Sequence, residues 1–475
     1  MEVGDYRGST VHFGTDGWRA RIDEAFTDDN VVRVADAIGS VWEEASRGAI
    51  VYVGYDTREG AARFARLVGE VLSARGLCAF VSDVACPAPA LSWAVAHDMR
   101  ACGGIMLTAS HNPEEYQGIK IRMPDGGAAP KEFTDEVELR MAAEPTSRRG
   151  SISFRDIVTP YLEGLAAAVD ADAISRAGLK VVHDPMYGSA RGCLARVLRG
   201  MGVEVHEIHA DDVEGFCGLH PEPVEPWVDE CEQAVLAEGA AAGLVNDGAG
   251  ARFGLVDERG RLVGPHVVLS LVLGHLVRNR GMSGRVVVTA STSAMALALA
   301  DLLGCQASVV PVGFKWVYAE MKRGDVLLGG EESGGIGVPA HMLERDGLLT
   351  ALLLCELMAM SGKGIAQLVD ELEQAVGRMC YVRRDLRMPV ELIEMLKNLL
   401  PGMNPPELAG RVPVEVSHKD GLRMMFEDGS WAMIRPSGTE PLVRVYAEAG
   451  DVQSRDDILE AAVELARAPF GASGE

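Results

Sequence analysis

The chain has 475 residues, of which 48% are hydrophobic and 24% charged, a composition that excludes a wholly disordered protein. At roughly 150 residues per domain, this length predicts three or four domains. The formal charge of −24 argues against binding to nucleic acids or anionic membranes, so a phosphate site has to be locally basic or built from backbone N–H groups.

The sequence contains no predicted membrane span or export signal. The longest apolar run, residues 348–360, has 13 residues and predicts a buried helix, because a spanning helix needs roughly 20. The first residues are acidic where a signal peptide would be basic. Nine cysteines without a C-x-x-C pair predict reduced, mostly buried thiols and a cytoplasmic protein.

Short β-branched runs alternate with longer helical patterns through most of the chain, which predicts parallel or mixed sheets covered on both faces. In the first unit, strands are predicted at residues 49–55, 77–81 and 103–107, and a helix is predicted at 59–75. The pattern restarts with strands at 179–184, 204–209 and 242–246. It restarts again with a strand at 284–289 and a helix at 293–303.

The last hundred residues follow a different pattern. Helices are predicted at 365–376 and 390–400, and strands at 380–386, within 415–427 and within 430–448. The fold class is therefore α/β, with three similar mixed α/β units and a smaller C-terminal α+β domain. Boundaries are predicted near residues 155, 255 and 370.

Residues 108–120 (TASHNPEEYQGIK) follow the strand predicted at 103–107, at the sheet edge where α/β proteins usually bind ligands. Taken alone, Ser110 and His111 indicate only a surface turn, since adjacent residues make a poor Ser–His dyad. The whole string, however, resembles the phosphoserine loop of the α-D-phosphohexomutases, the family of phosphoglucomutase and phosphomannomutase.

This resemblance implies a phosphoryl group on Ser110 that is passed to a sugar monophosphate, with a hexose 1,6-bisphosphate as intermediate and activator. Such a phosphate carries about −1.5 to −2 charges, so cations have to surround it. His111 and Lys120 are the nearest candidates, with Lys120 as proton donor or acceptor or as an electrostatic clamp. Arg19, in FGTDGWRA, is implied to lie near Ser110; Arg58, in GYDTR, either belongs to the same site or holds the fold through a salt bridge.

Residues 246–254 (NDGAGARFG) match the family's metal loop only in part. Asp247 and Arg252 are retained, but Ala249 and Ala251 stand where the family has aspartates that bind Mg²⁺. The expected metal site, made by Asp247 and an oxygen on Ser110, is therefore weakened.

Three explanations of this loop remain open. The chain is a natural degenerate member of the family, or it is an engineered or variant form of an active enzyme. Alternatively, another carboxylate supplies the missing ligands, with Asp257 and Glu258 the nearest in sequence.

The sugar-binding loop of the family resembles GGEESGG (329–335), preceded by GFKW (313–316) and followed by ERDG (344–347). The resemblance implies that Glu331 and Ser333 contact the sugar hydroxyls and that Lys315 lies close by. Carboxylates suit this role because they accept hydrogen bonds from two vicinal hydroxyls. The two glycines after Ser333 favour glucose over glucosamine phosphates.

Residues 434–448 (IRPSGTEPLVRVYAE) provide an arginine, hydroxyls and a glycine between two strands, the groups that bind phosphate. By resemblance, the non-reacting phosphate is bound by Arg435, Ser437, Gly438 and Thr439. Arg444 is expected to support this loop, and His220 is given no role.

Together these strings imply four domains around a central cleft. Their ranges and contributions are 1–155 (phosphoserine), 156–255 (metal loop), 256–370 (sugar binding) and 371–475 (phosphate binding). The expected protein is a monomeric or homodimeric mutase that interconverts hexose 1-phosphate and 6-phosphate, glucose more readily than mannose. The alternatives are a sugar-phosphate-binding protein with vestigial catalysis and a serine hydrolase that uses Ser110.

Overall fold

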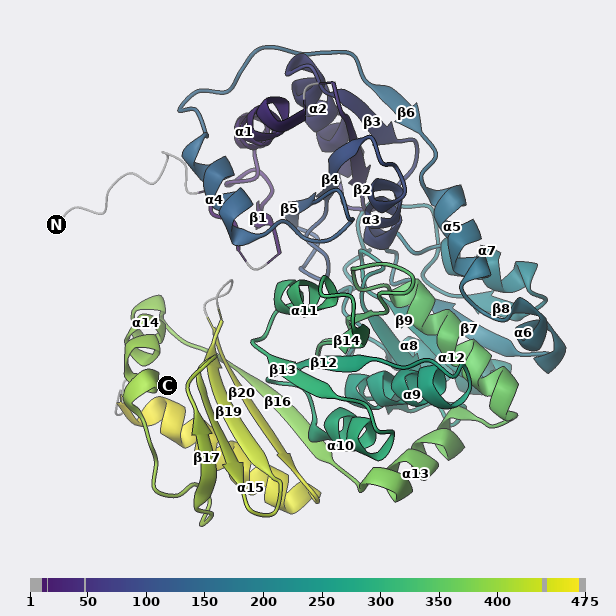
Figure 1. Ribbon diagram of the computed structural model, residues 1–475, viewed down its shortest axis with the longest axis vertical. Coiled ribbons are helices and arrows are strands. Elements are labelled where there is room, and N and C mark those ends of the chain that lie inside the picture. Colours follow the sequence, from purple (N-terminus) through teal and green to yellow (C-terminus); the bar gives the residue numbers. More distant parts are fainter. Residues whose placement is uncertain (1–10, 15, 47, 438–441, 470–475) are drawn as a thin grey trace.

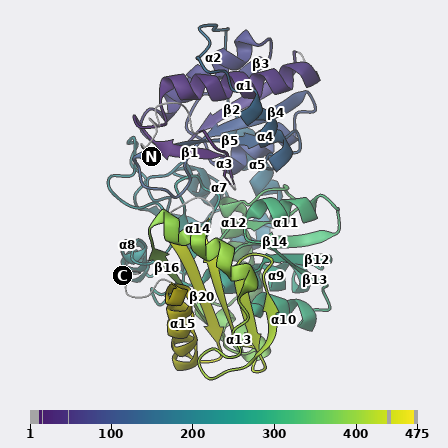
Figure 2. The ribbon, with the colours of Figure 1, turned by 90° about the vertical axis from the view of Figure 1, so that its left-hand side faces the viewer.

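The computed structural model describes residues 11–469 except residues 15, 47 and 438–441. Its strands form four separate sheets, one in each of four domains (Figure 1). The predicted fold class is confirmed: three mixed α/β domains are followed by a domain built on an antiparallel sheet. Figure 2 shows the first domain above the others, with the fourth domain in front of the second and third.

The first domain has a six-stranded sheet in the order β1-β5-β4-β2-β3-β6. Its strands are Trp18–Arg21 (β1), Ile50–Tyr55 (β2), Cys78–Ser82 (β3), Ala101–Leu107 (β4), Tyr116–Arg122 (β5) and Ser153–Arg155 (β6). Its helices are Asp28–Ser46 (α1), Ala61–Ala74 (α2), Ala88–Ala96 (α3) and Lys131–Leu139 (α4). The strands and the helix predicted for this unit are confirmed as β2, β3, β4 and α2.

The segment 108–120, which resembles the phosphoserine loop, is a loop only up to residue 115. Its second half is β5, which lies antiparallel between β1 and β4. A strand forms here because Tyr116-Gln-Gly-Ile-Lys-Ile-Arg is buried on both faces after its first residue. Lys120 therefore stands on a rigid strand.

The second domain has a five-stranded sheet in the order β11-β10-β9-β7-β8. Its strands are Lys180–Asp184 (β7), Glu204–Glu207 (β8), Ala242–Asn246 (β9), Phe253–Val256 (β10) and Leu262–Val263 (β11). Its helices are Val158–Ala167 (α5), Ala171–Ala177 (α6), Cys193–Gly200 (α7) and Asp229–Glu238 (α8). The three strands predicted here are confirmed as β7, β8 and β9, which pair in parallel.

The third domain has a four-stranded sheet in the order β13-β12-β14-β15. Its strands are Arg285–Thr289 (β12), Ala307–Val310 (β13), Val326–Gly330 (β14) and Ile336–Gly337 (β15). Its helices are Pro265–Arg278 (α9), Ala294–Leu302 (α10), Phe314–Met321 (α11), Gly347–Ser361 (α12) and Ile365–Val376 (α13). The predicted β12, α10 and α13 are confirmed.

The fourth domain has an antiparallel sheet in the order β16-β20-β19-β18-β17. Its strands are Cys380–Arg387 (β16), Pro413–Ser417 (β17), Leu422–Phe426 (β18), Trp431–Pro436 (β19) and Leu442–Ala449 (β20). Its helices are Val390–Leu399 (α14), the 3₁₀ turn Leu400–Gly402 and Val452–Arg467 (α15). These elements agree with the predicted α+β pattern.

The apolar run at 348–360 forms α12, which is buried over most of its length, as predicted. Among the described residues no single helix is long and apolar enough to cross a membrane, although α12 and α13, bent by 85°, satisfy length and composition as a pair. All nine cysteines are free thiols and six are buried, in agreement with the prediction.

Candidate active site

The loop that carries Ser110 joins β4 to β5 at the end of the parallel strands. Ser110 is 4% exposed and has a φ of 57°, in the left-handed region that few residues other than glycine adopt. Arg58 holds the loop in this shape. Its buried guanidinium donates to the carbonyl oxygens of Ser110 and Asn112, to two further carbonyls of the loop and to Asp56. Arg58 thus makes the predicted salt bridge and also organises the serine loop.

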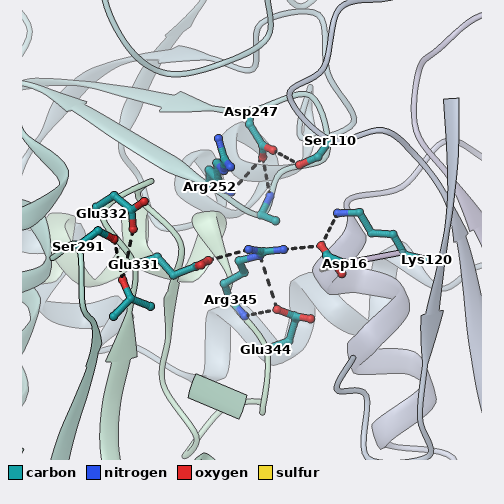
Figure 3. A network of polar contacts seen from close by, with 12 residues as sticks. Asp16, Ser110, Lys120, Asp247, Arg252, Ser291, Glu331, Glu332, Glu344 and Arg345 are labelled. Atoms are coloured by element: carbon teal, nitrogen blue, oxygen red, sulfur yellow. Dashed lines mark hydrogen bonds and ion pairs between the residues drawn. The ribbon is translucent and has the colours of Figure 1, made fainter. Parts of the chain in front are cut away.

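Asp247, from the second domain, lies directly opposite Ser110 (Figure 3). The Ser110 hydroxyl donates to Oδ2 of Asp247 at 2.7 Å. The backbone N–H groups of Ala251 and Arg252 donate to Oδ1 at 2.8 and 2.9 Å. Both oxygens of this wholly buried carboxylate therefore have donors, and Asp247 connects the second domain to the serine loop.

The residues of the loop 247–252 do not fit the magnesium site that the resemblance implied. Ala249 and Ala251 offer no ligand atom, and they are 0% and 4% exposed. Five of the six backbone oxygens of this loop are engaged as well. Carbonyl groups that accept backbone N–H donors belong to Asp247, Gly248, Ala249, Gly250 and Arg252. Asp247 alone remains as a carboxylate, and both of its oxygens are hydrogen-bonded.

The suggestion that Asp257 or Glu258 replaces the missing ligands is wrong. Both follow β10, at the opposite end of that strand from the loop 247–252. Asp257 accepts from Arg261 at 2.7 Å, and Glu258 accepts from the N–H of Ala366 at 3.1 Å. Asp257 is thus engaged in a local salt bridge, and Glu258 is engaged at the start of α13.

A buried network of charges lies between the first and third domains, beneath Ser110 (Figure 3). Asp16 pairs with Lys120 at 2.9 Å and with Arg345 at 2.5 Å. Arg345 also donates to Glu331 at 2.8 Å. The network thus joins Lys120 on β5 to the sugar-loop glutamate of the third domain.

Burial changes the acidity of the cations in this network. It lowers the pKa of Lys120 to about 8, although the carboxylate of Asp16 opposes the change. Burial also lowers the pKa of Arg19 to about 10, and the carboxylate of Asp16 again opposes the change. Arg19 donates to the side chain of Asn112 at 2.6 Å, which places it on the serine loop, as the resemblance implied.

His111, on the serine loop of the first domain, lies close enough to Arg252 of the second domain to feel its charge. Burial, followed by the charge of Arg252, holds the pKa of His111 well below its ordinary value, so the imidazole is neutral. Arg252 pairs with Glu222 at 2.6 Å. Burial alone would raise the pKa of Glu222, but the neighbouring His111, a hydrogen bond from His220 and the charge of Arg252 hold it well below its ordinary value.

The two adjacent glutamates of the segment 329–335 form hydrogen bonds with different partners. Glu331 accepts from Arg345, whereas Glu332 accepts from the hydroxyl of Thr289 at 3.2 Å. An added Cβ at Gly335 would lie 2.8 Å from Cδ of Arg345, so the arginine side chain would have to shift. The second glycine therefore leaves Arg345 in place next to Glu331.

Lys315 and Ser333 also belong to the third domain. Lys315 is in the first turn of α11, and it lines a cavity of about 200 Å³ together with Asp16, Gly17 and Lys131 of the first domain. This cavity brings Lys315 to the edge of the charge network. Ser333 is half-buried in the turn between β14 and β15.

The phosphate-binding residues predicted for the fourth domain are described only in part. Arg435, at the end of β19, pairs with Asp420 at 3.0 Å, and Ser437 is buried. Gly438 and Thr439 lie outside the described residues. The ends of β19 and β20 next to this loop point toward the first and third domains (Figure 1).

Several charged residues of the site were not predicted. Asp16 and Arg345 lie inside the strings FGTDGWRA and ERDG, but neither string indicates with which residue its charged side chain forms an ion pair. Arg383, on β16, carries a charge that acts on Glu222 of the second domain. Its strand is adjacent to that of Arg444, which in turn pairs with that of Arg435, and these are the two arginines of the fourth domain that the sequence did indicate. An excess of arginine on these strands was the available signal.

Sequence models of one family match the chain in four consecutive segments. The phosphoglucomutase/phosphomannomutase alpha/beta/alpha domains I, II and III match residues 10–148, 159–260 and 265–376, and the C-terminal domain of the same family matches residues 393–465.

Individual relatives agree with this assignment over nearly the whole chain. A phosphoglucomutase/phosphomannomutase of Thermococcus kodakarensis is 31% identical, covering 95% of this chain and 98% of the relative. A phosphoglucosamine mutase of Synechococcus sp. (strain CC9311) is 30% identical, covering 96% and 97%. The solved structure of a putative phosphomannomutase from Thermus thermophilus is 34% identical, with a TM-score of 0.87 and coverage of 96% and 99%. The chain therefore belongs to the phosphoglucomutase/phosphomannomutase family, the α-D-phosphohexomutases.

Proposed function

We propose that this protein interconverts a hexose 1-phosphate and a hexose 6-phosphate through a phosphoryl group on Ser110. Ser110 would donate the group to the sugar phosphate, and the resulting bisphosphate would return its other phosphoryl group after turning in the site. The observation that carries the proposal is the position of Ser110. Its hydroxyl is held by Asp247 at 2.7 Å, and the buried pair of Lys120 and Asp16 belongs to the network beneath it.

Lys120 is the proposed proton donor and acceptor for the sugar hydroxyl. Its lowered pKa, about 8, supports this role, because a group that exchanges protons works best near the ambient pH. Arg19 and a neutral His111 complete the proposed catalytic set. Arg252, Lys315, Glu331 and Ser333 are proposed to bind the sugar phosphate, and the phosphate remote from Ser110 is assigned to Arg435, Ser437, Gly438 and Thr439.

Glucose is the proposed sugar, in preference to mannose or glucosamine. The argument against glucosamine rests on the two glycines after Ser333, Gly334 and Gly335, a pattern that the resemblance associates with glucose. Relatives named phosphoglucosamine mutases are about as similar as the one named phosphoglucomutase/phosphomannomutase, so overall identity does not separate the substrates.

A second candidate is a sugar-phosphate-binding protein with vestigial catalysis. The observation that favours it is the loop 247–252, in which Ala249 and Ala251 lack ligand atoms. Both candidates predict that the protein binds a sugar phosphate, but only the mutase predicts that it converts the sugar phosphate.

The test combines calorimetry with glucose 1-phosphate and an assay of glucose 6-phosphate formation in the presence of glucose 1,6-bisphosphate. The mutase proposal predicts binding, turnover and one phosphoryl group on the intact protein, and it predicts that Ser110→Ala loses the turnover and the added mass. Binding without turnover would favour the second candidate. Cleavage of carboxylic esters, lost in Ser110→Ala, would point to a hydrolase.

A further inference from the structure

The loop 247–252 differs from the metal loop that the family pattern requires, and the difference changes its charge in a particular way. Three carboxylates around one divalent cation carry a single formal negative charge. Asp247 without a cation carries the same single charge. The cation and the two carboxylates that would bind it are thus missing together, and the net charge opposite Ser110 is unchanged.

Packing in this loop supports the same interpretation. Ala249 belongs to an apolar cluster that includes Ala88, Ala190 and Leu348. Its carbonyl oxygen accepts the N–H of Ala88 at 2.8 Å. A carboxylate at position 249 would be desolvated among these groups unless a cation accompanied it. The loop is therefore packed as an apolar turn with one acceptor, Asp247, aimed at Ser110.

Positive charge reaches the site from the protein itself. Burial opposes the charged form of Arg345, but the carboxylates of Asp16, Glu331, Glu344 and Asp247 raise its pKa, and its guanidinium pairs with Asp16 at 2.5 Å and with Glu331 at 2.8 Å. Arg19 lies on the serine loop through Asn112. Buried guanidinium groups of this kind can stabilise a transferring phosphoryl group as a metal ion does.

We infer that this chain transfers the phosphoryl group of Ser110 without a divalent cation, with Asp247 as the acceptor of the serine proton and Arg345 and Arg19 as the balancing charges. This inference rests on the proposed mutase function. When Ser110 receives the group, its Oγ forms a bond to phosphorus while the bond between phosphorus and the sugar oxygen breaks. The serine proton passes to Oδ2 of Asp247, and the sugar oxygen takes a proton from Lys120; the reverse transfer returns both protons.

The first experiment measures the conversion of glucose 1-phosphate to glucose 6-phosphate by ³¹P NMR, with glucose 1,6-bisphosphate present, in Mg²⁺ and in EDTA. We expect equal rates in the two buffers. Asp247→Asn keeps an acceptor oxygen but cannot take the proton, so its rate is expected to fall by about 10²–10⁴-fold, the usual contribution of a general base. Ser110→Ala, purified in the same way, measures any contaminating host mutase.

The matched control restores the family pattern with the double substitution Ala249→Asp and Ala251→Asp. This variant is expected to depend on Mg²⁺, losing about 10²-fold in EDTA, the size of one lost electrostatic contact to the transition state. Isothermal calorimetry with MgCl₂ gives a readout apart from turnover. No binding heat is expected for the wild type, and a heat of binding is expected for the double variant.

The outcomes separate the two proposals. Turnover that requires Mg²⁺ in the wild type would overturn the inference and leave the mutase function standing, as would a heat of Mg²⁺ binding that Asp247→Asn removes. Absence of turnover in both buffers would overturn the mutase function and the metal-free transfer together. Should the double variant fail to fold, the wild-type rates in the two buffers still decide the matter.

Discussion

Ser110 shows how much of the surrounding structure is needed to place one hydroxyl group. A non-glycine residue in a sparsely populated backbone region costs about 1–3 kcal/mol, and the cost is tolerated only where neighbouring groups determine the conformation. Arg58 is such a neighbour, because it bonds to four carbonyl oxygens of the serine loop. Asp247 then orients the hydroxyl itself.

Lys120 gives a prediction about pH. In the proposed reaction Ser110 donates its phosphoryl group first, and in that step Lys120 has to accept the proton of the sugar hydroxyl, so the neutral amine is the active form. Because its pKa is about 8, we expect kcat/KM to rise as the pH rises through that value. Lys120→Arg should remove this rising limb and lower the rate throughout, since arginine stays charged and cannot accept the proton. Steady-state rates across this pH range test the prediction. A limb that survives in Lys120→Arg would assign the ionisation to another group.

The same shift also makes the stability of the folded protein depend on pH. The pKa of Lys120 is about 8 in the folded protein against an ordinary value of 10.5. Between these values the unfolded chain binds the proton and the folded protein does not. The contribution of Lys120 to the free energy of unfolding therefore increases with pH across that window.

The N-terminus of α12 lies inside the protein, so the free N–H groups of its first turn need a buried hydrogen-bond acceptor. Asp346 caps it by accepting the N–H groups of Leu348 and Leu349 at 3.0 and 2.9 Å. The same carboxylate accepts the hydroxyl of Tyr161, from α5 of the second domain, at 2.9 Å. One side chain thus begins the helix and joins it to a neighbouring domain.

Asp346→Ala is expected to lower the free energy of unfolding by about 2–4 kcal/mol, the sum of a lost cap and an unpaired buried hydroxyl on Tyr161. Asp451→Ala is the control, since Asp451 caps α15 at the surface by accepting the N–H of Ser454. Its loss should be clearly smaller. Urea unfolding followed by circular dichroism compares the two variants, and equal losses would contradict the argument from burial.

For the whole molecule, the buried charge network is the main polar link between the first and third domains. Arg345 bonds to Asp16 of one domain and Glu331 of the other, and Arg122 pairs with Glu344 beside it at 3.2 Å. An arginine held between two carboxylates in this way fixes how the serine loop faces the sugar loop.

Arg345→Met is expected to destabilise the protein by about 3–5 kcal/mol, because Asp16 and Glu331 would remain buried without their shared cation. The control is Arg323→Met, which removes an arginine paired with Glu320 at the surface, where its side chain is 66% exposed. Surface changes of this kind usually stay within about 0.5 kcal/mol. Differential scanning calorimetry compares the variants, and a loss in Arg323→Met as large as that in Arg345→Met would refute the burial argument.

The sequence by itself determined the features that depend on neighbouring residues. Helix and strand patterns are local, so α13, β16 and the buried helix α12 were predicted from periodicity and apolar runs. The strings around Ser110, Glu331 and Arg435 were recognised for the same reason, as was the loss of ligand atoms at Ala249 and Ala251.

Only the tertiary structure decided which of these groups meet. Ser110 and Asp247 are 137 positions apart, and Arg345 and Asp16 are 329 positions apart, so no local pattern relates them. The strand β5, buried on both faces, also depended on its neighbours β1 and β4. Electrostatic pairing and burial act through space, between residues that are distant in the sequence. They therefore decided how Arg345 is paired and how far the pKa of Lys120 is lowered. They also decided which oxygens of the loop 247–252 are already hydrogen-bonded.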